Sequence, residues 1–229
     1  MIKAIIFDFD GLILDTEMPE YLSNKEMFEE HGQEFPLEEW GANIGRGWDE
    51  PGMSPYETLQ SKLSFPVNIE TLRVKRRKRN EAMILENCIL PGVVKVLNEA
   101  KAKGLKLGVA SSSSLEWVGG HLSRLGLLER FDILRCSDHV TKTKPHPELY
   151  LSAIEALGVF AHEAIALEDS RNGSLAAKAA GLYTIVIPNE VTRHSNFSHA
   201  DSLLSSLGEL SLDHLLVQFH KRTEEPKHD

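Results

Sequence analysis

The chain has 229 residues, of which 41% are apolar and 26% are charged, as is usual for a soluble globular protein. Its 34 acidic and 25 basic residues give a net charge of −9, which argues against nucleic acid as a partner because phosphate affinity comes from basic surface. No apolar stretch reaches the 18 or so residues that span a bilayer, so we expect no membrane association. Cys88 and Cys136 form no CxxC pattern and are typical of thiols in a reducing compartment, so we expect a cytoplasmic protein.

Short apolar runs alternate with helical patterns along the chain, which indicates βα units on a parallel sheet. The runs that we expect to be strands are Lys3–Phe7, Lys106–Ala110, Ile133–Cys136, Ala164–Leu167 and Thr184–Ile187. They lack the polar alternation of half-exposed strands, as expected where helices cover both faces of a sheet. The helices expected between them are Gly92–Lys103, Leu115–Leu125, Pro147–Leu157 and Ser174–Ala180. The predicted fold class is therefore α/β, with a doubly wound, Rossmann-like core.

One gap interrupts this rhythm between the first and second strands. It is about a hundred residues long, far more than a βαβ crossover requires. Within it, Met18–His31 and Ile69–Glu86 have helical patterns, and Pro36, Pro51, Pro55 and Pro66 suggest turns between shorter pieces. We therefore predict a small helical cap domain over residues 16–85, inserted into a core domain made of residues 1–15 and 86–229.

Polar side chains stand at or just beyond the ends of four predicted strands. Each alone is explained as a helix N-cap or a surface residue. In doubly wound sheets, however, ligands bind beyond the carboxyl ends of the strands, so these groups could meet in one crevice. They are, in chain order, Asp8, Asp10, Ser111, Lys144, Glu168 and Asp169. Their joint occurrence makes a chance arrangement a poor explanation.

The charge of this set predicts a metal ion. Four carboxylates and one ammonium sum to −3, and like charges so close cannot all stay ionised without a cation among them. Carboxylate oxygens are ligands that Mg²⁺ prefers, and one divalent ion brings the sum to −1. An anionic substrate could then be accommodated.

The spacing Asp8-Phe9-Asp10 is suited to phosphoryl transfer. Past the strand end, Gly11 can let the chain turn away and leave both carboxylates facing one pocket. One carboxylate can attack phosphorus, and the other can protonate the leaving oxygen and later accept a proton from water. Lys144 and Ser111 suit binding of the phosphoryl oxygens.

Four ordered stretches resemble the motifs of the haloacid dehalogenase-like hydrolase superfamily. They are Phe7–Glu17, Val109–Ser111, Lys144–Pro147, and Leu167–Ser170 with Gly173. The helical insertion resembles the type-one cap of that superfamily. The most similar branch contains β-phosphoglucomutase and phosphoglycolate phosphatase.

The resemblance implies roles for individual residues. Asp8 would be the nucleophile and Asp10 the general acid and base, whose presence favours a phosphate ester as substrate. Mg²⁺ would be held by the Asp8 carboxylate, the Asp10 backbone carbonyl and Asp169, with support from Glu168. Ser111 and Lys144 would bind the phosphoryl group. Ser112 and Thr16 are further candidates for contact with the substrate.

The implied activity is a Mg²⁺-dependent phosphatase that acts on a small phosphorylated metabolite through an aspartyl-phosphate. A sugar phosphomutase is the alternative, but mutases of this branch carry a His where this chain has Glu20, and a Lys-Asn pair where it has Ser114-Leu115. A phospho-receiver signalling module also gathers Asp, Ser or Thr, Lys and Mg²⁺ at strand ends. It has no hundred-residue insertion, and it usually takes its phosphate on a later strand.

Two basic features lie in the expected cap. Arg46, between Gly45 and Gly47, could close over an anionic substrate or could be a solvated loop residue. The run Lys75–Arg79 falls on a predicted helix, where five consecutive positions point around the axis, so we expect it to be mostly solvated. We expect a monomer or a weak homo-oligomer.

Overall fold

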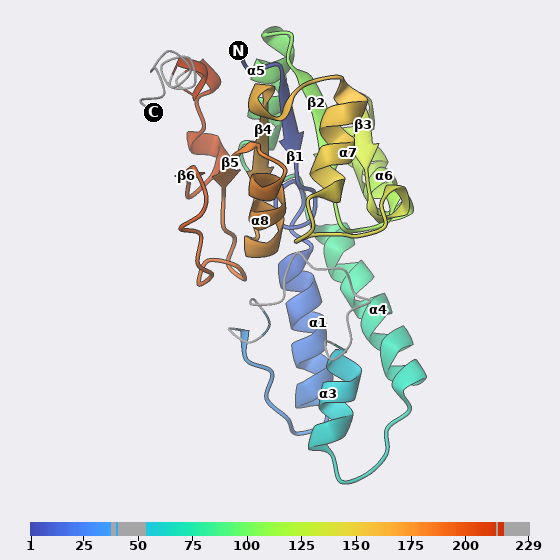
Figure 1. Ribbon diagram of the computed structural model, residues 1–229. Helices are drawn as coiled ribbons and strands as arrows, with labels where there is room; N and C mark the ends of the chain where they lie inside the picture. The colour runs from blue at the N-terminus through green and yellow to red at the C-terminus, as the bar shows by residue number, and fades with distance from the viewer. Residues whose placement is uncertain (38–39, 41–53, 214, 218–229) are drawn as a thin grey trace.

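The core of the protein is a six-stranded parallel sheet. The computed structural model describes residues 1–37, 40, 54–213 and 215–217. In the sheet the strand order is β3-β2-β1-β4-β5-β6, and every neighbouring pair is parallel (Figure 1). The strands are β1 (Ala4–Phe7), β2 (Lys106–Ala110), β3 (Ile133–Arg135), β4 (Ala164–Glu168), β5 (Tyr183–Val186) and β6 (Ser202–Leu203). The chain extends the sheet to one side of β1 and then to the other, which confirms the predicted doubly wound α/β class.

Helices cover both faces of the sheet because its central strands are apolar on both. Ile5 and Phe7 of β1 pack with α5 (Val93–Ala102) and α6 (Leu115–Arg124) in one buried cluster. Ala4 and Ile6 pack with α7 (Glu148–Leu157) and α8 (Arg171–Ala179) in another. All four side chains of β1 are fully buried, which makes the strand a rigid support for the residues that follow it.

The structure differs from the sequence prediction at three elements. Helix α8 begins at Arg171 rather than at Ser174, because the Ser170 hydroxyl accepts a hydrogen bond from the Gly173 N–H and caps the helix earlier. Pro55 is the first residue of helix α3 (Pro55–Lys62) and not part of a turn, a position that suits proline. The two-residue strand β6 was not predicted. Short 3₁₀ helices occupy Leu128–Arg130, Ser137–His139, Ala161–Glu163 and Leu207–Glu209.

Three helices lie together beyond one end of the sheet (Figure 1). They are α1 (Glu17–Glu29), α3 and α4 (Ile69–Glu86). Met27 and Phe28 of α1 form a small apolar cluster with Tyr56 and Leu59 of α3, and Ile69 and Leu72 of α4 pack against it. All three helices fall within residues 16–85, where the helical insertion was expected.

The basic run on α4 contributes to the packing of these helices. Lys75 pairs with Glu30, Arg76 with Glu20, and Arg79 with Glu26, so three ion pairs join α4 to α1. Arg77 pairs with Glu81 one turn away on α4 itself. Four of the five side chains of the run are exposed, as expected, and three of the five also pair with carboxylates of α1 or of its C-cap residue Glu30.

Two crossing segments connect these helices to the core. The Leu90 N–H donates to the Ile13 carbonyl at 2.9 Å, and the Asn87 side-chain amide donates to the Asp15 carbonyl at 2.7 Å. Because the chain leaves β1 at Phe7 and enters α1 at Glu17, the three helices lie at the carboxyl end of β1. The division into a core domain and a cap domain at residues 16 and 85 stays a prediction.

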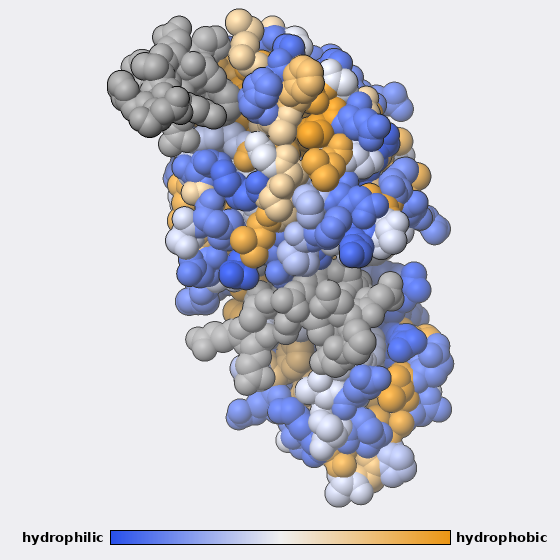
Figure 2. All heavy atoms as spheres, in the orientation of Figure 1, coloured by the Kyte–Doolittle hydropathy of each residue, from blue (hydrophilic) through white to orange (hydrophobic). Residues whose placement is uncertain are grey.

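Hydrophilic side chains cover most of the visible face of the molecule, with apolar side chains in smaller groups between them (Figure 2). Among the described residues, no helix combines the length and apolar character needed to cross a membrane.

Candidate active site

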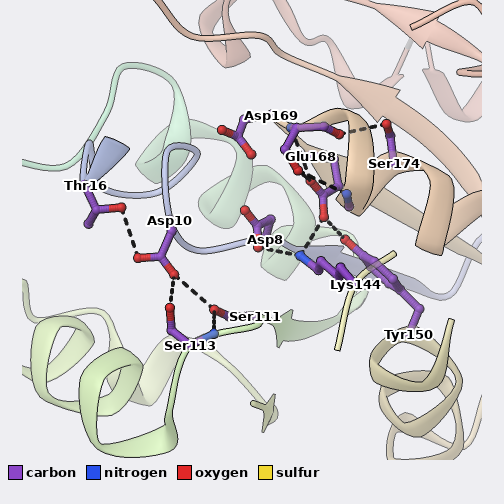
Figure 3. A network of polar contacts seen from close by, with 12 residues as sticks. Asp8, Asp10, Thr16, Ser111, Ser113, Lys144, Tyr150, Glu168, Asp169 and Ser174 are labelled. Carbon is purple, nitrogen blue, oxygen red and sulfur yellow. Dashed lines mark hydrogen bonds and ion pairs between the residues drawn. The ribbon is translucent and has the colours of Figure 1, made fainter. Parts of the chain in front are cut away.

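A buried cluster of charged side chains stands at the carboxyl ends of β1 and β4 (Figure 3). The Lys144 ammonium lies 2.6 Å from Asp8 Oδ1 and 2.6 Å from Glu168 Oε1. Lys144 is only 2% exposed and Glu168 is fully buried. A lysine withdrawn from water in this way needs charged partners, and the two carboxylates supply them.

The electrostatics of the cluster follow from this burial. Burial raises the pKa of Asp8 to about 7; Lys144 opposes the rise, and Glu168 and Asp10 add to it. Burial alone would lower the pKa of Lys144, but Asp8 and Glu168 outweigh it and hold that pKa above its usual value. Lys144 therefore keeps its positive charge, but this single charge does not balance the Asp8 carboxylate and its acidic neighbours.

Two hydroxyl groups fix the Glu168 carboxylate in addition to Lys144. The Tyr150 hydroxyl from α7 donates to Glu168 Oε1 at 2.6 Å, and the Ser170 hydroxyl donates to Oε2 at 3.2 Å. Gly173 on α8 permits this position, since a Cβ there would lie 2.0 Å from the Glu168 carboxylate. The glycine in the fourth motif thus has a steric role.

One carboxylate oxygen of Asp169 has no protein partner among the described residues. Its Oδ2 accepts a 2.6 Å hydrogen bond from the Asn189 amide, and the Thr192 hydroxyl donates to its backbone carbonyl at 2.8 Å. Its Oδ1 is buried and has no hydrogen-bond partner among the described residues. Burial and the neighbouring carboxylates Asp8, Glu168 and Glu17 raise the pKa of Asp169 well above its usual value.

This orphaned oxygen fits a bound cation. Asp8, Glu168 and Asp169 each offer a carboxylate oxygen, and these oxygens lie within 4.8 Å of one another. Their charges, with Lys144, sum to −2, and hard carboxylate oxygens suit a divalent ion such as Mg²⁺. The residues present are therefore compatible with the metal that the motifs imply.

Asp10 lies apart from this cluster and is surrounded by donors. Its Oδ1 accepts from the Thr16 hydroxyl at 3.0 Å and from the Trp117 indole at 2.9 Å. Its Oδ2 accepts from the hydroxyls of Ser111 at 3.1 Å and Ser113 at 2.7 Å. Figure 3 shows the Asp10 carboxylate facing these hydroxyls, while Asp8 faces Lys144. The two motif carboxylates therefore have separate environments.

The other sequence candidates are placed as follows. Ser111 follows β2 and is fully buried, with its hydroxyl on Asp10, and Ser112 is the next residue of the same loop. The Thr16 hydroxyl also contacts Asp10. Contact of these residues with a substrate stays a prediction. Arg46 lies outside the described residues.

Ser113 belongs to the run of four serines, Ser111–Ser114, whose sequence is typical of a phosphate-binding turn. Sequence reasoning missed three residues that contact the site: Tyr150, Asn189 and Trp117. Tyr150, on a helix with an apolar pattern, has the usual signature of a core residue. Asn189 and Trp117 carry no local signal, because their contacts join segments far apart in the chain.

Comparison with known proteins places this fold and site in a family. The sequence profile of the haloacid dehalogenase-like hydrolases matches residues 5–187. The Bacillus subtilis (strain 168) protein YhcW, named as a phosphatase, is 47% identical over 222 residues, which cover 95% of this chain and 100% of that protein. Hexitol phosphatase B of Escherichia coli (strain K12) is 32% identical over 229 residues, which cover 94% of this chain and 97% of that protein.

A solved structure agrees with these relatives. CbbY from Rhodobacter sphaeroides, crystallised with xylulose-1,5-bisphosphate, has a TM-score of 0.73 and 34% identity. The match covers 92% of this chain and 97% of CbbY. The chain belongs to the haloacid dehalogenase-like hydrolases. Within that family its activity is that of a phosphatase, as the sequence motifs led us to expect.

Proposed function

We propose that this chain is a Mg²⁺-dependent phosphatase that hydrolyses a small phosphorylated sugar or sugar alcohol through an aspartyl-phosphate on Asp8. The observation that carries the proposal is the buried contact of Asp8 with Lys144, beside the Glu168 and Asp169 carboxylates. In such an arrangement, Lys144 and a bound Mg²⁺ would offset both the charge of the Asp8 carboxylate and the charge of a phosphoryl group beside it.

In the first step, Asp8 attacks the phosphorus of the substrate. Because Lys144 occupies Oδ1, the attacking oxygen is Oδ2. A bond forms between Oδ2 and phosphorus, and the bond between phosphorus and the ester oxygen breaks. The Asp10 carboxyl gives its proton to the departing oxygen, so the product leaves as a neutral alcohol.

In the second step, water hydrolyses the acyl phosphate. The Asp10 carboxylate takes a proton from the water as its oxygen bonds to phosphorus, and the bond between phosphorus and Asp8 breaks. Asp8 returns as a carboxylate, and inorganic phosphate leaves. Ser111 and Lys144 hold the phosphoryl oxygens through both steps, with Ser112 and Thr16 as further candidates for contact with the substrate.

Mg²⁺ would be held by the carboxylates of Asp8 and Asp169 and by the Asp10 backbone carbonyl, with Glu168 in support. When bound, it supplies positive charge that offsets the carboxylates and the phosphoryl oxygens. The orphaned Oδ1 of Asp169 supports this assignment.

A phosphorylated sugar or sugar alcohol is proposed as the substrate class on the basis of the relatives. One similar protein is named a hexitol phosphatase, and another was crystallised with a ketose bisphosphate. We also propose that residues 16–85 act as a cap that closes over the substrate, excludes water during the first step and includes Arg46.

The environment of Glu20 favours hydrolysis over phosphoryl transfer to a second sugar position. Glu20 stands where mutases of this branch carry a His. Here its carboxylate accepts from Arg76 and Asn80 and is buried between α1 and α4. A carboxylate engaged in this way does not offer the free base that a His would supply. The receiver alternative does not fit the family or the helices inserted between β1 and β2.

The test is Asp8→Asn, assayed with p-nitrophenyl phosphate and with a panel of phosphorylated sugars and sugar alcohols. We expect phosphate release to be abolished while the circular dichroism spectrum is unchanged. Asp213→Asn, at a side chain that is 83% exposed, is the matched control and should keep full activity. Full activity in Asp8→Asn would remove the assigned nucleophile.

Two further measurements address the other parts of the proposal. Exhaustive removal of Mg²⁺ by a chelator should abolish turnover, and readdition should restore it. Conversion of β-glucose 1-phosphate into glucose 6-phosphate faster than phosphate release would instead identify a mutase.

A further inference from the structure

Trp117 on α6 makes a side-chain contact with Asp10 that no sequence motif indicates. Its indole N–H donates to Asp10 Oδ1 at 2.9 Å. Of the four donors that the described residues offer to this carboxylate, Trp117 is the one that comes from a regular helix of the core rather than from a loop or a helix cap. The contact is partly buried, so water competes with it only weakly.

The indole ring is held in place from two directions. At the backbone, Trp117 belongs to the first turn of α6, where its N–H donates to the Ser114 hydroxyl that caps the helix. At the ring, Trp117 packs edge-on against His121, with 4.4 Å between ring centroids and an interplanar angle of 73°. The two residues are four positions apart and so share one face of the helix.

His121 links the indole to the segment that carries Asp10. Its ring stacks on that of Phe9, with 6.3 Å between centroids and an angle of 28°. Phe9 is fully buried and directly precedes Asp10 in the chain. The position of the indole is therefore fixed relative to the backbone of the residue whose carboxylate it binds.

The chemistry of the donors distinguishes the indole from the hydroxyls that contact Asp10. An indole N–H can only donate, whereas serine and threonine hydroxyls can donate or accept. Oδ1 accepts from the indole and from the Thr16 hydroxyl, and Oδ2 accepts from the hydroxyls of Ser111 and Ser113. Of these contacts, the one from the indole has a fixed donor direction, because the hydroxyl groups can rotate and exchange roles. The indole is therefore the most directional constraint on the Asp10 carboxylate.

We propose that Trp117 is a positioning residue for Asp10, which fixes the orientation of the Asp10 carboxyl group by holding Oδ1 through the indole N–H. This inference rests on the proposed function, in which Asp10 is the general acid and base. It adds a residue on α6 to the groups on which turnover depends. A purely structural tryptophan, whose N–H simply finds an acceptor, is the competing explanation.

The decisive experiment is a double-mutant cycle between Trp117→Phe and Asp10→Ala, with p-nitrophenyl phosphate as substrate. Phenylalanine keeps the ring that packs on His121 and removes the N–H. We expect Trp117→Phe to lower kcat about ten- to a hundredfold and to change KM little, because a displaced catalytic group affects the reacting state more than binding. In the Asp10→Ala background the same change should alter kcat less than about twofold.

Each arm of the cycle has a distinct meaning. An equal fall in kcat with and without Asp10 would overturn the positioning role, since Trp117 would then act through something else. If Asp10→Ala alone keeps full activity, the proposed role of Asp10 fails, and the result is separable from a failure at Trp117.

A spectroscopic measurement tests the contact even if Trp117→Phe folds poorly. In ¹⁵N-labelled protein, the Trp117 indole N–H signal should move to lower ¹H frequency in Asp10→Ala, because the charge-assisted hydrogen bond is lost. The indole signals of the other tryptophans should stay in place. An unmoved Trp117 signal would show that the bond to Asp10 does not form and would overturn the inference.

Discussion

At the residue scale, the active site depends on backbone positions where a side chain has no room. Gly173 allows the Glu168 carboxylate to pack directly against α8. Gly11 has a positive φ of 77°, and a Cβ there would lie 2.3 Å from Asp169 Oδ2. Gly173 leaves room for the Glu168 carboxylate and Gly11 leaves room for the Asp169 carboxylate, both of which lie near Asp8. The two glycines therefore contribute to the geometry of the charged cluster and take no part in the chemistry.

Gly173→Ala tests this steric role. The added Cβ must push the Glu168 carboxylate away from Lys144 and Tyr150, so we expect the free energy of unfolding to fall by about 1–3 kcal/mol. Phosphatase activity should fall with it. Urea denaturation and p-nitrophenyl phosphate turnover measure the two effects.

Gly119→Ala is the matched control on α6, where a Cβ would meet no atom within 4 Å. Alanine is the better helix former, so stability should stay the same or rise by up to about 1 kcal/mol. Equal destabilisation at both positions would contradict the steric explanation for Gly173.

At the scale of elements, the pairing of α1 with α4 depends on one half-buried arginine more than on the basic run as a whole. Arg76 donates to Glu20, to the Tyr56 hydroxyl at 2.7 Å and to the Ser23 hydroxyl at 3.3 Å. In the pair with Glu20, the side chains are 13% and 12% exposed, whereas Arg77 is 76% exposed. Neighbouring residues of one charged run therefore have unequal effects on stability.

Replacing the two arginines separately should reveal this difference. Arg76→Ala leaves the buried Glu20 carboxylate without its main cation, and we expect a loss of about 3 kcal/mol. Arg77→Ala removes only an exposed pair with Glu81 and should cost less than about 0.5 kcal/mol. Chemical denaturation of both variants measures the difference, and comparable losses would show that burial does not decide the contribution of Arg76.

At the scale of the whole molecule, the surplus of carboxylates in the site links stability to pH and to metal. Asp8 has a folded-state pKa of about 7 against an ordinary value of 3.8. Between these values the folded chain keeps a proton that the unfolded chain has lost. The contribution of the Asp8 carboxyl group to the free energy of unfolding therefore decreases as pH rises through this window. Asp169, whose pKa is also raised, acts in the same direction.

We therefore expect Mg²⁺ to stabilise the protein more at about pH 7.5 than at about pH 5, because the ion binds the deprotonated carboxylates. The measurement is the melting temperature at each pH, with excess Mg²⁺ and with a chelator. Asp169→Asn should reduce the rise in melting temperature that Mg²⁺ causes at the higher pH. If Mg²⁺ raised the melting temperature equally at both pH values, metal binding would not depend on ionisation of the carboxylates.

The sequence by itself determined the layout of this protein. Short apolar runs that alternate with helical patterns predicted the parallel sheet, and the bounds of α4 were predicted as observed. The same reasoning picked out the polar residues at the strand ends, which are a local signal. Of these, Asp8, Lys144 and Glu168 lie in contact in the structure. Their catalytic roles stay predictions. Each of these residues is recognised from its own strand. They meet in space because the strands are parallel and their carboxyl ends share one edge of the sheet.

Only the tertiary structure decided which side chains pair. Asn189 contacts Asp169, Trp117 contacts Asp10, and Arg76 contacts Glu20 across separations of 20, 107 and 56 residues. Helix and strand periodicity predict on which face of its own element a residue lies. They do not predict which residue of another element it contacts. That choice depends on how the helices pack against the sheet and on how the connecting loops return to it. The charged cluster was therefore predictable, while the hydrogen bonds that orient its carboxylates were not.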